Sequence, residues 1–460
     1  MSLKQVSLAA LLLFAPASVQ AQGQSCDLAG SRQLYSVGEG AVMYVGGPVF
    51  TCDSGSRITA DSAIYLRETG RVDFIRNVRF ADADRTLTAQ NAQYLPRERR
   101  VMAQVDVVLT NNRDGSTLRG TALDYYQASP TYPDGRIDVH TGRPRATLIR
   151  RRAQTAAIDT TIVDSDRMQI IGERLFRGWG NVQTRRGDMR STSQFAEFDE
   201  ANNRMRLTGQ ASVQSDTFRL RADSIEAVLI NGDEFRELHA FRQVVLESEG
   251  VDLTAPVLHL AFTNGEVERL VALGGERSQA GAPQARAVSP DFVLVADSID
   301  ALSPKQKLER VFAVGGARGE RWGDTLTDRS LPELIRNDWV QGDTIRAYFT
   351  QKRDTTRRVA APAPRPGQQR GAVRTAATSD STRVLERIVA LGSPASSTYR
   401  LREQAGDSVE ISVNYLTAKM LDVTFKDGAV HKVMAEGEIR GLYLQPPSRA
   451  QAAAEPRRQP

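Results

Sequence analysis

Closely spaced carboxylates are the residues of this sequence whose type and spacing most directly suggest chemistry. Asp223 and Glu226 lie three residues apart in "ADSIEA", and Asp297 and Asp300 do so in "ADSIDA". Two carboxylates that converge can act as a general acid and a general base, or hold a metal ion. On a β-strand, however, positions i and i+3 point to opposite faces. We therefore expect Asp223 and Glu226 to be exposed charges that do not converge.

The histidines and the glycine-rich stretches give no catalytic pattern. The four histidines, His140, His239, His259 and His431, form no His-x-His or His-x₃-His pair, and no Ser/His/Asp arrangement is visible. "GGARGERWGD" (315–324) lacks the Lys-Ser/Thr of a phosphate-binding loop. The stacked Asn or acidic clusters of pectate-lyase-like β-helices are also not found. The sequence predicts a protein that is not an enzyme, with no catalytic residues, metal site or cofactor.

The first residues predict export. "MSLKQVSLAALLLFAPASVQA" combines a Lys, a short apolar run and a small-residue cleavage site, which is typical of a secretory signal peptide. An uncleaved anchor is the alternative, although the apolar run is short for a membrane span. No other stretch approaches 18 apolar residues, so we expect a soluble mature chain.

The two cysteines fit the same compartment. Cys26 and Cys52 are the only cysteines of the chain. An even pair in an exported protein predicts a disulfide. A zinc site on the two thiols lacks a nearby histidine.

Two short phrases of the sequence are repeated along the chain. "ITADSAIYL" (58–66) returns as "LRADSIEAVL" (220–229) and "LVADSIDAL" (294–302), with looser copies starting at 87, 118, 189, 253, 340 and 409. The starts at 58, 87 and 118 differ by 29 and 31 residues. Between these copies stand returns such as "VERLVALGG" (267–275), "LERVFAVGG" (308–316) and "LERIVALGS" (385–393), with turn sequences such as "TNG". Each repeat of about 30 residues therefore reads as one β-hairpin.

The repeats predict an all-β fold of stacked hairpins, in one long module or two consecutive ones. One hairpin cannot bury its apolar face alone, but successive hairpins can pair into a folded-over sheet that encloses one. The Gly-Gly of "LERVFAVGG" is expected to end or bulge the return strand. Helical periodicity is almost absent, with one short helix expected near residues 331–337.

These repeats resemble the LptA/OstA family of periplasmic lipopolysaccharide-transport proteins. "ITADSAIYLRETGRVDFIRNVRFADADRTLTAQNAQYL" carries the resemblance most clearly, and it extends well over 58–126 and moderately over 189–316. The resemblance implies an elongated open β-jellyroll whose hydrophobic slot holds acyl chains. It implies a periplasmic protein that binds lipopolysaccharide or a similar glycolipid and passes it between inner and outer membrane, contributing to outer-membrane assembly.

The implied partners follow from the same resemblance. They are other β-jellyroll components that add to the sheet edges, together with the inner- and outer-membrane transport complexes. The formal charge of +5 is small and scattered, so no nucleic-acid partner is predicted. The alternative function is an envelope scaffold that uses its sheet edges for partner proteins and holds no lipid. A closed interior filled by side chains would favour this scaffold.

Alternation along the strands predicts which residues line the slot, and a register slip of one residue would turn them outward. The predicted inner-face residues are Ile58, Ala60, Ile64, Leu66, Phe74, Val78, Phe80, Val105, Val107 and Leu109.

The expected organisation follows the repeats and the composition, because "QKRDTTRRVAAPAPRPGQQRGAVRTAATSDS" reads as a linker. The segments are a signal peptide (1–21), an N-terminal segment with the Cys26–Cys52 disulfide (22–57), OstA-like repeats (58–275), further hairpins (276–350), a disordered basic linker (351–382), C-terminal hairpins (383–445) and a disordered tail (446–460).

Overall fold

The structure is a computed structural model of the chain. It describes residues 26–151, 158–172, 174–230, 234–248, 251–275, 282–289, 292–321, 337–353, 381–405, 408–426 and 429–444. Over these residues the chain is all-β, with thirty strands and two short 3-10 turns, so the predicted fold of stacked hairpins is confirmed. None of the described residues belongs to a helix that could cross a membrane. The signal peptide, the expected helix apart from Asn337, residues 354–380 of the linker and the tail lie outside the described residues.

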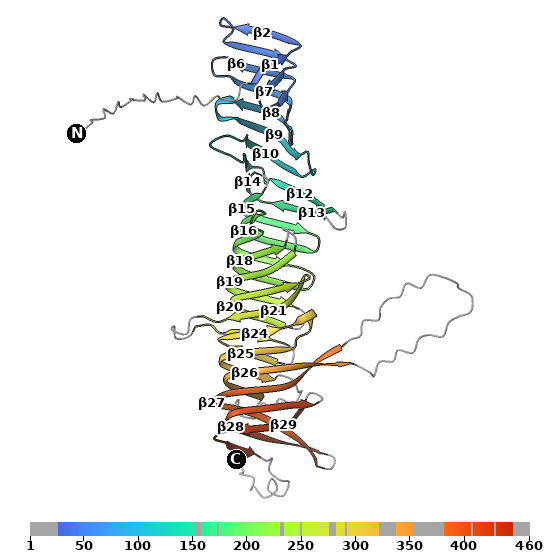
Figure 1. Cartoon of the computed structure of the whole chain (residues 1–460), viewed down its shortest axis with the longest axis vertical. Coiled ribbons are helices and arrows are strands. Elements are labelled where there is room, and N and C mark those ends of the chain that lie inside the picture. The colour runs from blue at the N-terminus through green and yellow to red at the C-terminus, as the bar shows by residue number, and fades with distance from the viewer. Residues whose placement is uncertain are drawn as a thin grey trace, which may run out of the picture. The chain divides into compact units, whose positions relative to one another are not determined.

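The chain divides into two compact units, Met1–Leu148 and Ile149–Pro460. Figure 1 labels the strands along the chain. The first unit holds β1 (Cys26–Gly30), β2 (Gln33–Val37), β3 (Val42–Gly46), β4 (Val49–Cys52), β5 (Arg57–Thr59), β6 (Ser62–Leu66), β7 (Arg71–Ala81), β8 (Arg85–Leu95), η1 (Pro96–Glu98), β9 (Arg100–Asn111), β10 (Thr117–Tyr126), β11 (Arg136–Thr141) and the start of β12 (Arg145–Arg151).

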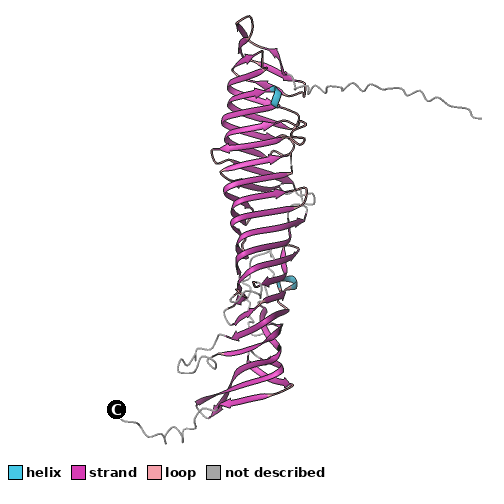
Figure 2. Cartoon of the chain, turned by 90° about the vertical axis from the view of Figure 1, so that its left-hand side faces the viewer, coloured by secondary structure: helices cyan, strands magenta, loops and turns pink. Residues whose placement is uncertain are grey.

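The second unit continues the same pattern of antiparallel strands (Figure 2). Its elements after β12 are β13 (Ile158–Asp164), β14 (Arg167–Ile171), β15 (Leu175–Arg186), β16 (Met189–Asp199), β17 (Arg204–Gln214), β18 (Phe218–Ile230), β19 (Glu234–Ser248), β20 (Val251–Thr263), β21 (Glu266–Leu273), β22 (Ala285–Val288), β23 (Phe292–Ala296), β24 (Ser298–Leu302), η2 (Pro304–Gln306), β25 (Arg310–Arg321), β26 (Asp338–Arg353), β27 (Ser381–Ala405), β28 (Ser408–Lys426), β29 (Ala429–Glu436) and β30 (Arg440–Leu444).

The long strands are bent near their middle by one of two kinds of corner. In the first kind, two successive residues take positive φ, as Arg76 and Asn77 do in β7 with φ of 60° and 46°. The ladder to β8 gains one extra residue there, which defines a β-bulge. The same paired geometry recurs at Val105–Asp106, Gly180–Asn181, Gly209–Gln210, Arg242–Gln243 and Gly315–Gly316.

The second kind of corner alternates with the first. In β18, Ala222 and Ile225 are both buried although they lie three residues apart, so the inward alternation slips by one residue. Ala89 and Ala92 in β8 show the same spacing. Each bent strand therefore contributes one half to each of two walls, and the bends of successive strands line up as a crease.

In the first unit we call these halves wall A and wall B. Wall A contains β2, β3, β6 and β11 with the adjoining strand halves, such as 71–75 of β7. Wall B contains β1, β4, β5 and the start of β12 with the other halves, such as 78–81 of β7. The walls end opposite the crease in hairpin turns, and we call that open side the mouth.

The repeated phrases of the sequence contain the residues that form these two kinds of corner. The backbone N–H of Asp61, in the first "ADS" copy, donates to the carbonyl of Arg76 at 3.0 Å, and its carboxylate accepts from Asn77 Nδ2 at 2.8 Å. Asp297, in the last copy, donates in the same way to the carbonyl of Gly315 at 3.0 Å. The motif aspartate thus ties one corner to the left-handed corner of the next strand. The predicted bulge at the Gly-Gly of "LERVFAVGG" is confirmed by the register shift between Val314 and Ala317.

Candidate functional site: the inner face of the folded sheet

The core of the first unit lies between its two walls. Phe50 of wall B meets Phe74 and Tyr65 of wall A edge to face, with ring centroids 5.4 and 5.6 Å apart. Phe80 of wall B meets Tyr125 of wall A at 5.6 Å. Because these contacts are between side chains only, no backbone hydrogen bond has to break for the two walls to part.

Most of the predicted inner-face residues lie where they were expected. Ile58 pairs with Phe80, which in turn pairs with Leu87 of β8. The predicted residues with buried side chains are Ile58, Phe74, Val78, Phe80, Val107 and Leu109. Ala60 lies at the crease and is half-buried.

Three predicted residues lie elsewhere. Ile64 and Leu66 pair with Asp73 and Arg71 on the outer face, whereas their neighbour Ala63 is buried opposite Phe74. The chain passes from wall B to wall A between β5 and β6, so the alternation counted from Ile58 slips by one residue. Val105 is 45% exposed because it is the first left-handed residue of the β9 corner, with φ of 64°.

Several inner-face residues were not predicted, among them Phe50, Tyr94 and Tyr125. Burial raises the pKa of Tyr94 to about 12. Burial, followed by the nearby Asp82 carboxylate, raises the pKa of Tyr125 as well. Tyr94 and Tyr125 lie just beyond the corners of β8 and β10. The sequence signal that could have located them is the Ala-x-x-Ala spacing at the β8 corner and the equivalent spacing in β10.

The lining between the walls is apolar. Within residues 26–148, the buried charged residues, Asp124 and Asp138, lie on the outer face, because they alternate with the inner residues Leu123, Ile137 and Val139. In the second unit the buried inner-face residues are mostly aliphatic, and they include Leu207, Ala211, Val213, Leu220, Ala222, Ile225, Ala227, Leu238, Ala240, Val244, Leu246, Leu253, Ala255, Leu258 and Leu260.

Alanine is frequent among the inner-face residues nearest the crease, beside larger residues such as Phe74 and Ile225. Ala92, Ala103, Ala222, Ala240 and Ala255 are buried there. A short side chain leaves room for the walls to approach where the strand turns. In the first unit, the larger Phe80, Leu87 and Tyr94 lie farther from the bend and fill the space toward the mouth.

The mouth of the first unit is closed by polar contacts. Tyr125 of wall A donates its hydroxyl to Asp82 Oδ2 of wall B at 3.0 Å. Gln127, just beyond β10, donates from Nε2 to Ser56 Oγ at 3.1 Å, and both residues are buried. The mouth of the first unit is therefore closed, and buried side chains such as Phe50, Phe80 and Tyr94 occupy the space behind it.

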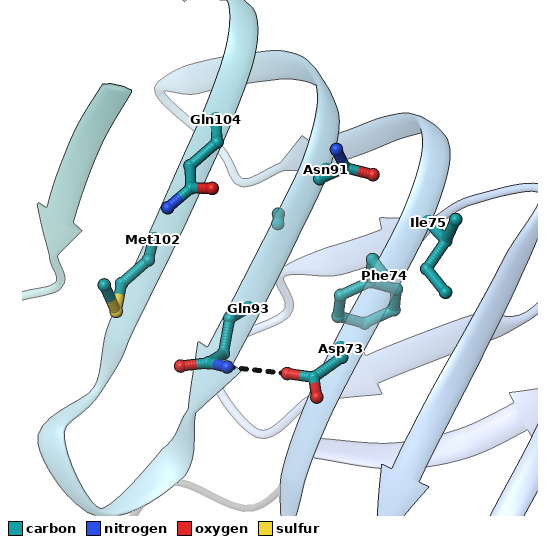
Figure 3. Close-up of a pocket in the computed structure, with 8 residues that line it drawn as sticks. Asp73, Phe74, Ile75, Asn91, Gln93, Met102 and Gln104 are labelled. Carbon is teal, nitrogen blue, oxygen red and sulfur yellow. Dashed lines mark hydrogen bonds between the residues drawn. The ribbon is translucent and has the colours of Figure 1, made fainter. Parts of the chain in front are cut away.

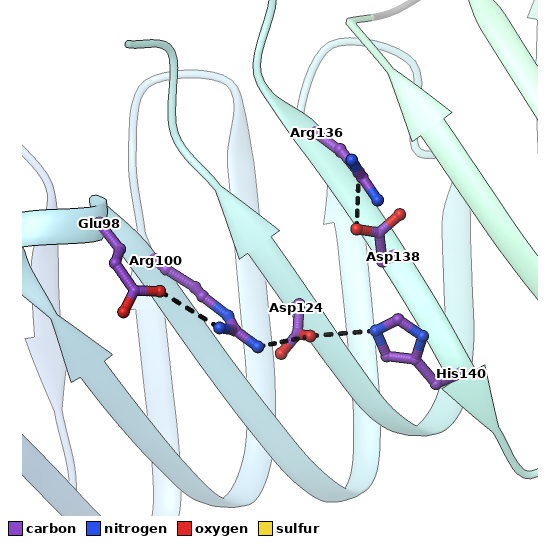
Figure 4. Close-up of polar contacts among 6 residues, drawn as sticks. All are labelled: Glu98, Arg100, Asp124, Arg136, Asp138 and His140. Atoms are coloured by element: carbon purple, nitrogen blue, oxygen red, sulfur yellow. Dashed lines mark hydrogen bonds and ion pairs between the residues drawn. The ribbon is translucent and has the colours of Figure 1, made fainter. Parts of the chain in front are cut away.

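The outer face of wall A carries a network of charged side chains (Figure 4). Arg100 donates to Asp124 at 2.8 Å and to Glu98 at 3.2 Å, and His140 Nε2 lies 3.0 Å from the same Asp124 oxygen. Arg136 and Asp138 pair nearby at 2.6 Å. Each carboxylate of this network has a cationic partner, which makes it a stabilising network rather than a free acid or base.

A shallow pocket lies on the outer face beside this network. In it Gln93 donates to Asp73 Oδ1 at 2.7 Å (Figure 3). Its lining is Asp73, Phe74, Ile75, Asn91, Ala92, Gln93, Met102 and Gln104. These are amides, apolar side chains and one carboxylate already paired with Arg71, so the pocket offers no nucleophile.

The carboxylates singled out in the sequence are exposed, as predicted, but for a different reason. Asp223 accepts from Arg242 at 3.1 Å and Glu226 pairs with Arg206 at 3.0 Å. The corner between them puts both on the outer face, so the expectation that they point to opposite faces was wrong. Among the described residues, no group of three or more His, Cys, Asp or Glu could hold a metal ion.

The predicted disulfide between Cys26 and Cys52 is present and ties β1 to β4. A structural disulfide indicates a non-reducing compartment, as in exported proteins. No protein-family model matches the chain, and no curated protein matches its sequence.

Proposed function

We propose that the chain binds acyl chains of lipopolysaccharide, or of a similar glycolipid, between its two walls. It acts in the periplasm and passes the lipid between inner and outer membrane, contributing to outer-membrane assembly. The observation that carries this proposal is the apolar inner face, which is repeated strand after strand in each unit.

The energetics favour such a site without catalysis. An acyl chain gains about 0.8 kcal/mol for each CH₂ group removed from water, so a twelve-carbon chain gains roughly 9 kcal/mol when it is fully enclosed. The walls meet through side chains alone, and their backbone ladders survive if they separate. Binding therefore has to displace side-chain contacts such as Phe50 against Phe74.

The ends of the sheet provide the surfaces for partners. β2 carries Leu34, Tyr35 and Val37, which are 54%, 68% and 46% exposed, and β30 carries Leu442 and Tyr443, at 55% and 47%. Exposed edge strands of this kind can accept a strand from a neighbour. We propose that other β-jellyroll components, and through them the inner- and outer-membrane transport complexes, add at these edges.

One observation favours the scaffold as a second candidate. The first unit is closed at its mouth and filled by side chains, which a protein that only organises partners would require. Under this function the edges are used as above and no lipid is carried.

Site-specific photocrosslinking distinguishes the two functions. A photoreactive phenylalanine is placed at Phe74, which is 2% exposed on the inner face, or at Ile75, which is 36% exposed on the outer face. A matched pair in the second unit is Leu238, fully buried, and its outer neighbour His239. Lipopolysaccharide adducts at Phe74 or Leu238, but not at Ile75 or His239, are expected. Folded protein with no adduct at either inner position would overturn the lipid proposal and favour the scaffold.

A further inference from the structure

The two hydrogen bonds at the mouth differ in kind from the aromatic contacts between the walls of the first unit, such as Phe50 against Phe74. Tyr125 and Asp82 are 43 residues apart in the sequence, and Gln127 and Ser56 are 71 apart. Aromatic and aliphatic contacts tolerate sliding, whereas a hydrogen bond weakens steeply when its geometry changes. These bonds therefore hold the walls at one separation.

Asp82 is built into its turn so that it can hold the tyrosine. Its Oδ1 accepts from the backbone N–H groups of Asp84 at 2.9 Å and Arg85 at 2.7 Å, which leaves Oδ2 for the Tyr125 hydroxyl. The guanidinium of Arg85 also lies over the Tyr125 ring, 5.4 Å from its centroid. Asp82 and Arg85, at the tip of wall B, thus both contact the Tyr125 side chain of wall A.

The second bond is anchored on both sides in the same way. Ser56 is fully buried, its carbonyl accepts from the Cys52 N–H at 2.8 Å, and its hydroxyl also lies 2.7 Å from Ser54 Oγ. Gln127 donates its own backbone N–H to the carbonyl of Arg99 at 3.0 Å. Both partners are therefore fixed by their own walls before they meet.

We propose that Tyr125–Asp82 and Gln127–Ser56 form a polar latch that holds the first unit closed and sets the rate at which an acyl chain enters between its walls. This inference rests on the proposed lipid function. The crease is closed by continuous backbone, so the mouth is the side at which the walls can part. A ligand entering there has to release the latch first.

The test removes the latch while leaving the remaining partners satisfied. Tyr125→Phe keeps the ring against Phe80, and half-buried Asp82 keeps its backbone donors. Gln127→Leu leaves Ser56 with Ser54 as partner. Tyr126→Phe is the matched control, because it removes the same hydroxyl from the next residue, which faces outward.

Wall opening is read without lipid from the maleimide labelling rate of a Val107→Cys reporter. Val107 is 1% exposed on the inner face, and the two native cysteines are bonded to each other, so they do not react in the absence of reductant. The double latch variant is expected to label about thirtyfold faster than the control, the factor for two hydrogen bonds of ordinary net strength. Far-ultraviolet circular dichroism checks that all variants remain folded.

Lipid entry is read from the binding rate of a fluorescent fatty acid to the same variants. A parallel rise in this rate supports the latch as a gate. Equal maleimide labelling rates in the latch and control variants would overturn the latch, whatever the fatty-acid binding rates are. Faster labelling with no fatty-acid binding by any variant would leave a purely structural clamp, and would count against the proposed lipid function instead.

Discussion

The left-handed corners are predicted to need glycine where a neighbouring strand lies too close for a side chain. Gly209, in the β17 corner, has φ of 79°, and a Cβ there would lie 2.7 Å from Gln194 Cβ on β16. Gly187, in the turn between β15 and β16, has φ of 56° with nothing within 4 Å of such a Cβ. Alanine substitutions at Gly187 and Gly209 therefore separate the cost of backbone strain from the cost of steric overlap.

The expected magnitudes differ accordingly. An L-residue in the left-handed region costs roughly 1–2 kcal/mol, and alanine recovers about 0.4–1 kcal/mol by restricting the unfolded chain. Gly187→Ala is therefore expected to lower the free energy of unfolding by about 1 kcal/mol or less. Gly209→Ala adds an overpacking cost of about 1–3 kcal/mol, for a total near 3 kcal/mol.

Local amide hydrogen exchange is the appropriate assay, because stacked hairpins can open locally. Peptides covering β16 to β18 should exchange roughly a hundredfold faster in Gly209→Ala and at most about fivefold faster in Gly187→Ala, since each 1.4 kcal/mol is a factor of ten. Adding Gln194→Gly, which removes the overlapping Cβ, should recover part of the Gly209→Ala loss. Equal exchange in the two single variants would refute the argument that the corner is sterically closed.

Three further predictions concern the disulfide, a histidine pair and the inner face. Cys26→Ser with Cys52→Ser should cost about 3.5 kcal/mol by loop-closure entropy for their separation of 26 residues, seen as faster exchange in β1; unchanged exchange there would contradict this. Burial, and then the neighbouring His239, lower the pKa of His259 from 6.5. The contribution of His259 to stability is therefore complete above pH 6.5 and falls as the pH drops below that value. The urea midpoints of wild type and His259→Asn should diverge between pH 7.5 and 5, and parallel curves would exclude this effect. Phe74→Asp should lose several kcal/mol because it buries a carboxylate against Phe50, whereas Ile75→Asp should change the thermal midpoint little; similar losses in both would show that the walls are not packed as described.

The hairpin repeats were predictable because strand, turn and return strand recur at a nearly constant interval. The crease was not, because it changes the alternation by a single residue within a strand. Ile64 and Leu66 fell on the wrong face for that reason alone. Val105 shows how far packing can override local preference, since a β-branched residue rarely takes positive φ. Apolar character marks which residues bury, but it does not mark where a strand bends.

The disulfide and the apolar lining could also be predicted from the sequence, whereas the closed mouth could not. Tyr125 and Asp82 come together only because four strands, β7 to β10, bend and stack in register between them. Ser56 and Gln127 depend on still more intervening structure. A bond of this kind leaves no periodic trace in the sequence, because each residue belongs to a different repeat.

The two units fill their inner faces with different side chains, and this difference bears on how each could admit a ligand. The first unit interlocks aromatic rings edge to face, as Phe50 does with Phe74 and Tyr65, and adds the latch at its mouth. The second unit also has ring pairs, such as Phe176 with Phe198 at 5.9 Å, but most of its buried residues are leucine, valine and alanine, such as Leu220 and Leu246. Aliphatic contacts draw on dispersion and hydrophobic burial, both of which an acyl chain can replace with contacts of the same kind. Ring–ring geometry and hydrogen bonds have no equivalent in a hydrocarbon ligand. Under the proposed lipid function, the second unit would therefore exchange its own packing for an acyl chain at the smaller cost, whereas the first unit would first have to release the proposed latch.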